Sequence, residues 1–136
     1  MQTIVLDTSA AVELILGRTS QRIVKAILEQ SHLTVVPQLF IAEICNVFWK
    51  LNCFQKLPEE DCIIGTNLAI NLVDEFVELN ELRTDAFTLA AENSIPVYDM
   101  FFLTLAIKRK ARLVTMDKKL NYCARKYSVK TLHSKM

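Results

Sequence analysis

The sequence predicts an α/β domain in which helices cover both faces of a central parallel sheet. Short apolar stretches rich in β-branched residues alternate with longer segments whose apolar residues recur at helical spacing. A chain of 136 residues, of which 51% are hydrophobic, is long enough to bury one sizeable core. It contains no internal repeat, linker or low-complexity tract, so we interpret residues 1–136 as a single domain.

The elements of the first half have separate sequence signals. β-branched and aliphatic runs mark two short strands, and Gly17 ends the first helix because glycine readily adopts the backbone conformation found just beyond a helix. Pro58, followed by three acidic residues, marks a helix start, since proline fits the first turn and acids are favourable there. We expect strands at 3–6 and 33–36, and helices at 8–16, 20–30, 37–54 and 58–76.

The second half continues the alternation with shorter strands. We expect strands at 76–79, 112–116 and 129–132, and helices at 82–93, 99–110 and 118–126. This gives a sheet of four to five short strands. Because helices separate the strands along the chain, the strands should run parallel and be covered on both faces.

Four carboxylates stand where the chain changes direction. They are Asp7, Glu43, Asp99 and Asp117. Ligands of open α/β sheets bind at the carboxyl ends of the strands, and hard divalent cations prefer several oxygen ligands. The sequence therefore predicts a divalent-cation site at this edge of the sheet.

Each acid also has a purely structural explanation. An aspartate at a strand-to-helix junction is a good N-cap, worth about 1 kcal/mol over alanine, and this applies to Asp7, Asp99 and Asp117. Glu43 interrupts an apolar helical stretch, and Asn46 shares its face, so the two could form a solvated polar stripe. The structural explanation would require four unrelated acids to fall at one edge of the sheet by chance. This is less plausible than any one of the four explanations alone, so the pattern favours a shared site.

Charge is distributed unevenly along the chain. The formal net charge is only +1, yet residues 108–136 hold ten basic residues and a single acid, Asp117. Such a segment is a candidate contact surface for nucleic-acid phosphates, with Lys108, Arg109, Lys118 and Lys119 as the candidates nearest the acids. The structural alternative is that these side chains cover the solvent faces of the last helices.

Several other functional classes lack their sequence signals. The only two glycines, Gly17 and Gly65, leave no room for a phosphate-binding or dinucleotide-binding loop, and no HExxH motif is present. A dehalogenase-like phosphatase would need a second aspartate where Ser9 stands, and a response-regulator receiver would need an acidic pair beside the first strand.

Four cysteines without metal-ligand spacing are expected to be small core residues in a reducing cytoplasm, and no apolar run is long enough to cross a membrane.

Segments 4–10, 37–46, 97–106 and 113–120 resemble, in order and spacing, the four motifs of PIN domains. The chain is most similar to the small VapC-type toxins of bacterial toxin–antitoxin pairs. The resemblance implies a three-layer α/β/α fold and Mg²⁺- or Mn²⁺-dependent cleavage of RNA phosphodiester bonds. It also implies catalytic, metal-holding roles for Asp7, Glu43, Asp99 and Asp117, and carboxylate- or water-orienting roles for Thr8, Ser9, Asn46 and Thr115. The bulky residues 100–102 depart from the usual third motif, which bears on substrate preference.

The resemblance further implies the partners of the protein. These would be an RNA substrate, a small antitoxin protein and a second copy in a homodimer, with no membrane. The apolar helix pair at 38–76 would offer a surface to the antitoxin or to the second copy. Two alternatives stay open: a PIN nuclease of RNA maturation or DNA processing, and a non-enzymatic module, either receiver-like or an inactive PIN domain. Retention of all four acids argues against the inactive form.

Overall fold

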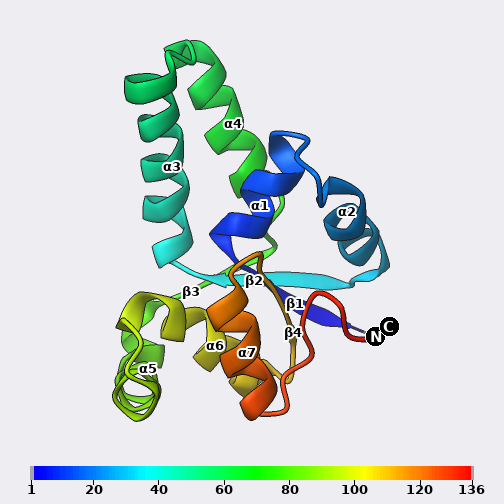
Figure 1. Ribbon diagram of the computed structural model, residues 1–136, viewed down its shortest axis with the longest axis vertical. Coiled ribbons are helices and arrows are strands. Elements are labelled where there is room, and N and C mark those ends of the chain that lie inside the picture. Colours follow the sequence, from blue (N-terminus) through cyan, green and yellow to red (C-terminus); the bar gives the residue numbers. More distant parts are fainter. Residues whose placement is uncertain (1, 136) are drawn as a thin grey trace.

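The computed structural model describes residues 2–135 (Figure 1). Its four strands form one sheet in the order β3-β2-β1-β4, and each neighbouring pair is parallel. In chain order, the elements of the described residues are β1 (Thr3–Leu6), α1 (Thr8–Ile15), α2 (Gln21–Gln30), β2 (Leu33–Pro37), α3 (Leu39–Gln55), α4 (Glu59–Asn71), β3 (Glu75–Val77), α5 (Leu79–Asn93), α6 (Val97–Arg109), β4 (Arg112–Val114) and α7 (Lys118–Lys126).

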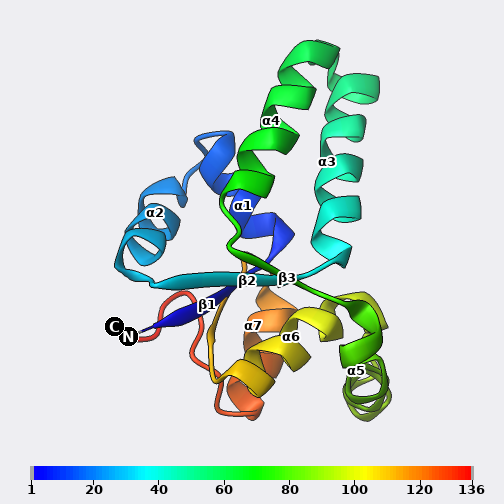
Figure 2. The ribbon, with the colours of Figure 1, turned by 180° about the vertical axis from the view of Figure 1, so that it is seen from behind.

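The sheet lies between two layers of helices. Helices α1 to α4 lie on one side of it and α5 to α7 on the other (Figures 1 and 2). Ile4, Val5 and Leu6 of the central strand β1 are fully buried. A strand covered on both faces needs apolar residues at successive positions rather than at alternate ones, which explains the continuous run. The predicted three-layer α/β/α fold is confirmed.

Helices α3 and α4 form a hairpin that projects from the sheet (Figure 1). Inside the hairpin, the buried ring of Phe48 packs directly over Gly65, where a Cβ atom would lie 2.3 Å from Phe48 Cε1. Glycine at this position therefore allows the close approach of the two helices. The base of α3 remains at the sheet, and this end of the helix carries Glu43.

The predicted fifth strand at 129–132 is wrong. One backbone hydrogen bond, from Leu113 N to Lys130 O at 2.8 Å, joins this segment to β4. The buried guanidinium of Arg112 then donates to the carbonyl oxygens of Thr131, Ser134 and Lys135. Within residues 129–132, the carbonyl oxygen of Thr131 is therefore bound to a side chain instead of to a neighbouring strand.

Other predictions need smaller corrections. Pro37 ends β2 instead of opening α3, the helix expected to reach residue 76 ends at Asn71, and α5 begins at Leu79. Two of the four cysteines, Cys45 and Cys53, are exposed, so the expectation that all four are core residues is wrong for this pair. Among the described helices, none combines the length and apolarity that a membrane crossing needs.

Candidate active site

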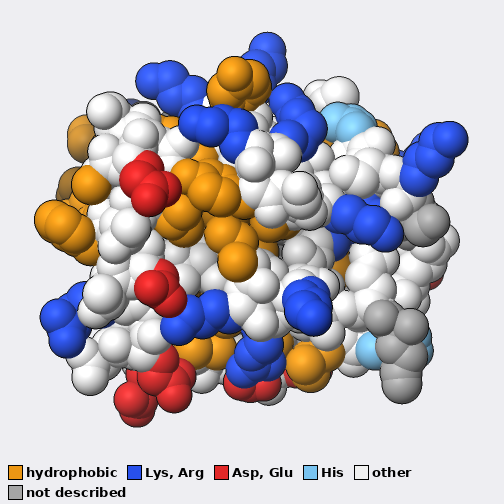
Figure 3. All heavy atoms as spheres, turned by 90° about the horizontal axis from the view of Figure 1, so that it is seen from below, with side chains coloured by type: hydrophobic (Ala, Val, Ile, Leu, Met, Phe, Trp, Pro, Cys, Tyr) orange, Lys and Arg blue, Asp and Glu red, His pale blue; other side chains and the backbone are white. Residues whose placement is uncertain are grey.

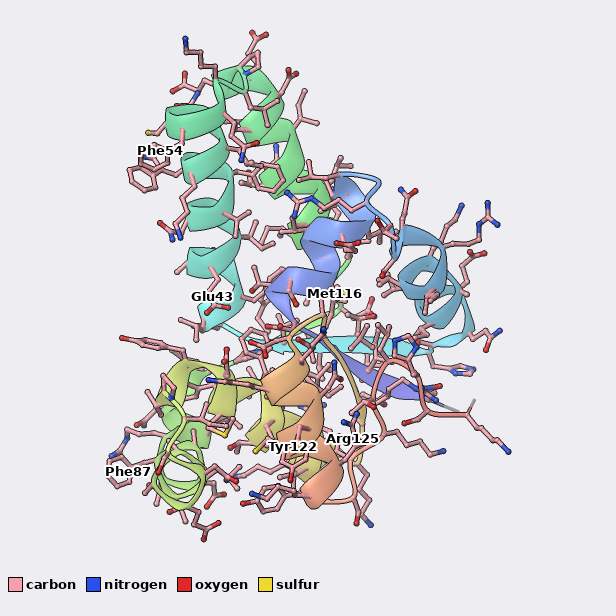
Figure 4. All side chains as sticks on the ribbon, viewed as in Figure 1. Glu43, Phe54, Phe87, Met116, Tyr122 and Arg125 are labelled. Atoms are coloured by element: carbon pink, nitrogen blue, oxygen red, sulfur yellow. The ribbon has the colours of Figure 1, made fainter. Side chains whose placement is uncertain are left out.

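A cavity of about 810 Å³ opens at the carboxyl-terminal edge of the sheet. All four predicted acids line it, although they come from four separate parts of the chain: Asp7, Glu43, Asp99 and Asp117. Glu43 lies at the base of α3, and Met116, which also lines the cavity, lies in the loop before α7 (Figure 4). The fold thus brings together the carboxylates that the sequence singled out.

Asp7 lies at the centre of a hydrogen-bond network. Its Oδ2 atom accepts hydrogen bonds from Ser9 Oγ at 2.9 Å and from Thr115 Oγ1 at 2.6 Å. Burial raises the pKa of Asp7; these two bonds oppose the rise, and the negative charge of Asp117 adds to it. Asp7 occupies the N-cap position of α1, but its side chain makes no capping bond. Capping therefore does not explain this aspartate.

Glu43 is held by the residue that follows Asp7. Thr8 Oγ1 donates a hydrogen bond of 2.7 Å to Glu43 Oε1, which links the start of α1 to α3. Burial raises the pKa of Glu43 to about 7; the bond from Thr8 opposes this shift, and the negative charges of Asp7 and Asp99 add to it. Glu43 is half-buried and bonded to Thr8, so a fully solvated polar stripe does not describe its surroundings.

Asp99 lies in the first turn of α6, whose N-cap residue is Pro96. The capping explanation is therefore wrong for Asp99 as well. Burial raises the pKa of Asp99 to about 6, and the negative charges of Asp7 and Asp117 add to the shift. The carboxylates thus influence one another across the cavity.

Asp117 is the one acid that caps a helix. Its Oδ1 atom accepts hydrogen bonds from the backbone N–H groups of Lys119 at 2.8 Å and Leu120 at 3.1 Å. Its own N–H donates to Thr115 Oγ1 at 3.1 Å. Capping occupies Oδ1 and also fixes the direction of the carboxylate, so the structural role and a role in the cavity are compatible.

The donor set suits a hard divalent cation. The cavity offers carboxylate oxygens from four parts of the chain, and burial together with mutual repulsion makes the ionised forms of Asp7, Glu43 and Asp99 unfavourable without a counter-charge. Within residues 2–135, no three acidic, histidine or cysteine side chains are close enough together to coordinate one ion as they stand. Mg²⁺ usually keeps several waters and takes one or two protein carboxylates, so such a site does not need three acids in direct contact with the ion.

The family-level comparison identifies the fold. The PIN domain family model matches residues 4–126, which include the four carboxylates. The chain belongs to the PIN domain family. Members of the PIN domain family are nucleases.

Solved structures share this PIN fold at low sequence identity. A crystal structure of a protein from Pyrobaculum aerophilum has a TM-score of 0.73 and 17% identity, covering 96% of this chain and 84% of that one. VapBC2 from Rickettsia felis, bound to a promoter DNA fragment, has a TM-score of 0.66 and 14% identity, covering 96% and 97%. FitAcB from Neisseria gonorrhoeae has a TM-score of 0.60 and 18% identity, covering 94% and 95%. No curated protein sequence matches the chain.

The predicted polar residues lie around the acids, whereas the predicted basic residues do not line the cavity. Thr8, Ser9 and Thr115 make the bonds described above, and Asn46 lines the cavity of this PIN domain. Lys108 and Arg109 lie in the last turn of α6, about 14 Å along the helix from Asp99, and form ion pairs with Asp85 and Glu75. Lys118 and Lys119 line a neighbouring cavity of about 420 Å³ beside α7. On the α5–α7 side, basic side chains surround an apolar area rather than forming one cluster (Figure 3).

Two cations that the sequence did not single out line the acid cavity. They are Arg18 and Lys50. Lys50 follows Glu43 and Asn46 at the spacing of one helix face, so the helical period was a usable signal. Arg18 lies in the turn after α1, which Gly17 makes possible with its positive φ of 64°. Nothing local in the sequence reveals that this turn faces α3.

Proposed function

We propose that this PIN domain, taken over residues 1–136, is a metal-dependent endoribonuclease and the toxin of a bacterial toxin–antitoxin pair. The observation that carries the proposal is the convergence of Asp7, Glu43, Asp99 and Asp117 on one open cavity in a member of a nuclease family. The proposed substrate is RNA in the cytoplasm. A PIN nuclease acting on DNA or in RNA maturation is the second candidate, and the substrate test below separates it from the first.

The proposed chemistry assigns a task to each group. A bound Mg²⁺ or Mn²⁺ supplies activation of the attacking water and neutralisation of the charge that develops on the phosphate. Asp7, Glu43, Asp99 and Asp117 would hold the ion, directly or through bound waters. Thr8, Ser9 and Thr115 fix the carboxylates of Glu43 and Asp7 through the bonds of 2.6 to 2.9 Å. Asn46 offers a further polar group at the cavity wall.

The direct test is cleavage of purified RNA. We expect the protein to cut an unstructured RNA oligonucleotide internally with Mg²⁺ or Mn²⁺ and to stop when EDTA is added. Matched single-stranded DNA should be cut far less. Preferential cutting of DNA would favour the second candidate, and uptake of phosphate from a small phosphodonor would favour a receiver-like module.

The basic residues should differ in their contribution to RNA binding. Lys50→Gln and Lys118→Gln should each lower affinity for RNA of any sequence and reduce the slope of log K against log salt by up to about 0.7, the value for one phosphate contact on a single strand. Arg18 and Lys119 should behave similarly. Lys108→Gln is the matched control, because Lys108 lies 3.1 Å from Asp85 and is already paired. Equal slopes for all three variants would assign these lysines to solvated surface.

The α3–α4 hairpin supports an antitoxin partner. Large apolar side chains are exposed along it: Trp49, Phe54, Ile63, Ile64 and Leu68. The rings of Trp49 and Phe54 pack edge to face, 5.8 Å apart, and are otherwise open to solvent. Contiguous exposed apolar surface of this kind marks protein interaction sites. A structural neighbour of 18% identity is a toxin–antitoxin complex from Klebsiella pneumoniae. We propose this hairpin as the surface that an antitoxin segment or a second copy covers.

A further inference from the structure

Tyr98 is an exposed aromatic residue placed at the acid cavity. Its side chain is 60% exposed, and it lines the cavity directly beside Asp99 in the chain. The other strongly exposed aromatic residues of the described chain, Trp49, Phe54, Phe87 and Tyr122, do not line this cavity. Tyr98 therefore differs from these four exposed aromatic residues because it lies at the acid cavity.

The Tyr98 ring has no partner within the part of the chain that the structure describes. It forms no aromatic pair there, in contrast to Trp49 and Phe54. Its backbone, however, is firmly placed. Pro96 caps the helix, and Met100 and Phe102, two and four residues further on, are fully buried in the core. The ring of Tyr98 is therefore exposed to solvent, whereas the start of α6, which carries it, is held in place by the core.

Cations on other elements line the same cavity as this ring. Arg18 and Lys50 line it from the turn after α1 and from α3, and within residues 2–135 neither has a carboxylate within 4.0 Å. A nucleotide at the cavity has two parts that need complementary surfaces, a negative phosphate and a flat base. Cations suit the phosphate, and an unpaired aromatic ring suits the base.

We propose that Tyr98 is the stacking platform for the nucleobase beside the scissile phosphate. The inference rests on the proposed function and adds a binding residue to its site. A base in a duplex is already stacked and paired, whereas a base in a loop or single strand is free to lie on a protein ring. Stacking tolerates any base, so Tyr98 selects for strand state rather than for sequence.

The test compares three substitutions of Tyr98. On single-stranded RNA, Tyr98→Leu should raise KM roughly 5- to 150-fold, the range that loss of one stacked base produces, with kcat nearly unchanged. Tyr98→Phe and Tyr98→Trp should keep the parent KM, because both retain a ring. Phe87→Leu is the matched control: Phe87 is 69% exposed on α5 and does not line the cavity. It should behave as the parent does.

A fluorescent base gives a readout that a merely structural role would not change. RNA carrying one 2-aminopurine should lose fluorescence on binding to the parent and to Tyr98→Phe in EDTA, and should lose little on binding to Tyr98→Leu. A parent-like KM and quench for Tyr98→Leu would overturn the inference and leave the proposed function standing. A raised KM for Tyr98→Phe would also overturn it, since the hydroxyl would then be the group that matters. Failure of the parent to bind or cut any RNA would overturn both.

Discussion

The substitution Asp99→Asn is expected to abolish RNA cleavage while stabilising the metal-free protein near neutral pH. Loss of one of four ion-holding carboxylates should remove several kcal/mol of transition-state stabilisation, a rate reduction of about 10³-fold or more. Asparagine has nearly the same shape as aspartate but carries no charge. The variant thus removes a repelled negative charge from the cavity without leaving a void.

The pH dependence follows from the sign of the pKa shifts. The pKa values of Asp99 and Glu43 are raised to about 6 and about 7 in the folded protein, against ordinary values near 3.8 and 4.5. Folding therefore disfavours the ionised forms, and stability present below about pH 4 is lost as the pH rises toward 7. The metal-free parent should melt at a higher temperature at pH 5 than at pH 8, and Asp99→Asn should show a smaller difference.

Mg²⁺ should act on stability in the opposite direction to rising pH. A ligand at a hundredfold excess over its Kd stabilises the protein by roughly 2.7 kcal/mol, and the melting-temperature shift should shrink in Asp99→Asn. Asp61→Asn is a matched control, because Asp61 is also the third residue of a helix that a proline caps, but it lies on the exposed hairpin. Loss of cleavage in Asp61→Asn would mean that helix-terminal charge, and not the cavity, decides activity.

The second large effect is expected from Gly65→Ala in the α3–α4 hairpin. An added Cβ would lie 2.3 Å from Phe48 Cε1 and 2.5 Å from Phe48 Cζ, far inside van der Waals contact. Phe48 is only 2% exposed, so its ring cannot swing into solvent. Overpacking of this kind costs about 1–3 kcal/mol, and the better helix propensity of alanine offsets up to about 1 kcal/mol of it.

Thermal unfolding measures this effect directly. Gly65→Ala should melt several degrees below the parent, and the double variant Phe48→Leu, Gly65→Ala should be less destabilised than the two single effects added together. Asn67→Ala, on an exposed position of the same helix, controls for propensity and should not lower the melting temperature. A melting temperature of Gly65→Ala equal to that of the parent would show that the hairpin opens freely at this contact.

Local sequence signals were enough for much of the fold. The apolar runs that became β1, β2 and β4 are nearly continuous because both sheet faces are covered, and helix α7 has the predicted bounds. The segment at 129–132 has the composition of a strand, but the side chain of Arg112, 19 residues earlier, donates a hydrogen bond to the carbonyl oxygen of Thr131. No local pattern reveals such a long-range bond.

In the candidate site, too, some residues could be predicted from local sequence and others could not. Asp7 and Asp117 could be found because they come just after strands whose carboxyl ends a parallel sheet must bring to one edge, and Glu43 and Asp99 because they lie near the starts of helices. The basic residues that line the cavity could not be located in the same way. Lys108 and Arg109 are paired with Asp85 and Glu75, acids that only the folded chain brings near them. Arg18 reaches the cavity because α1 and its turn face α3, which is a consequence of tertiary packing.

The rate of RNA cleavage as a function of free Mg²⁺, measured from EDTA upward, tests the central claim most directly. If the four carboxylates form one ion-dependent nuclease site, cleavage should be absent in EDTA. It should then rise to saturation and be half-maximal near the Kd that the Mg²⁺ dependence of the melting temperature gives for the same protein. Cleavage that persists undiminished in EDTA, or that Asp99→Asn performs as the parent does, would contradict the claim.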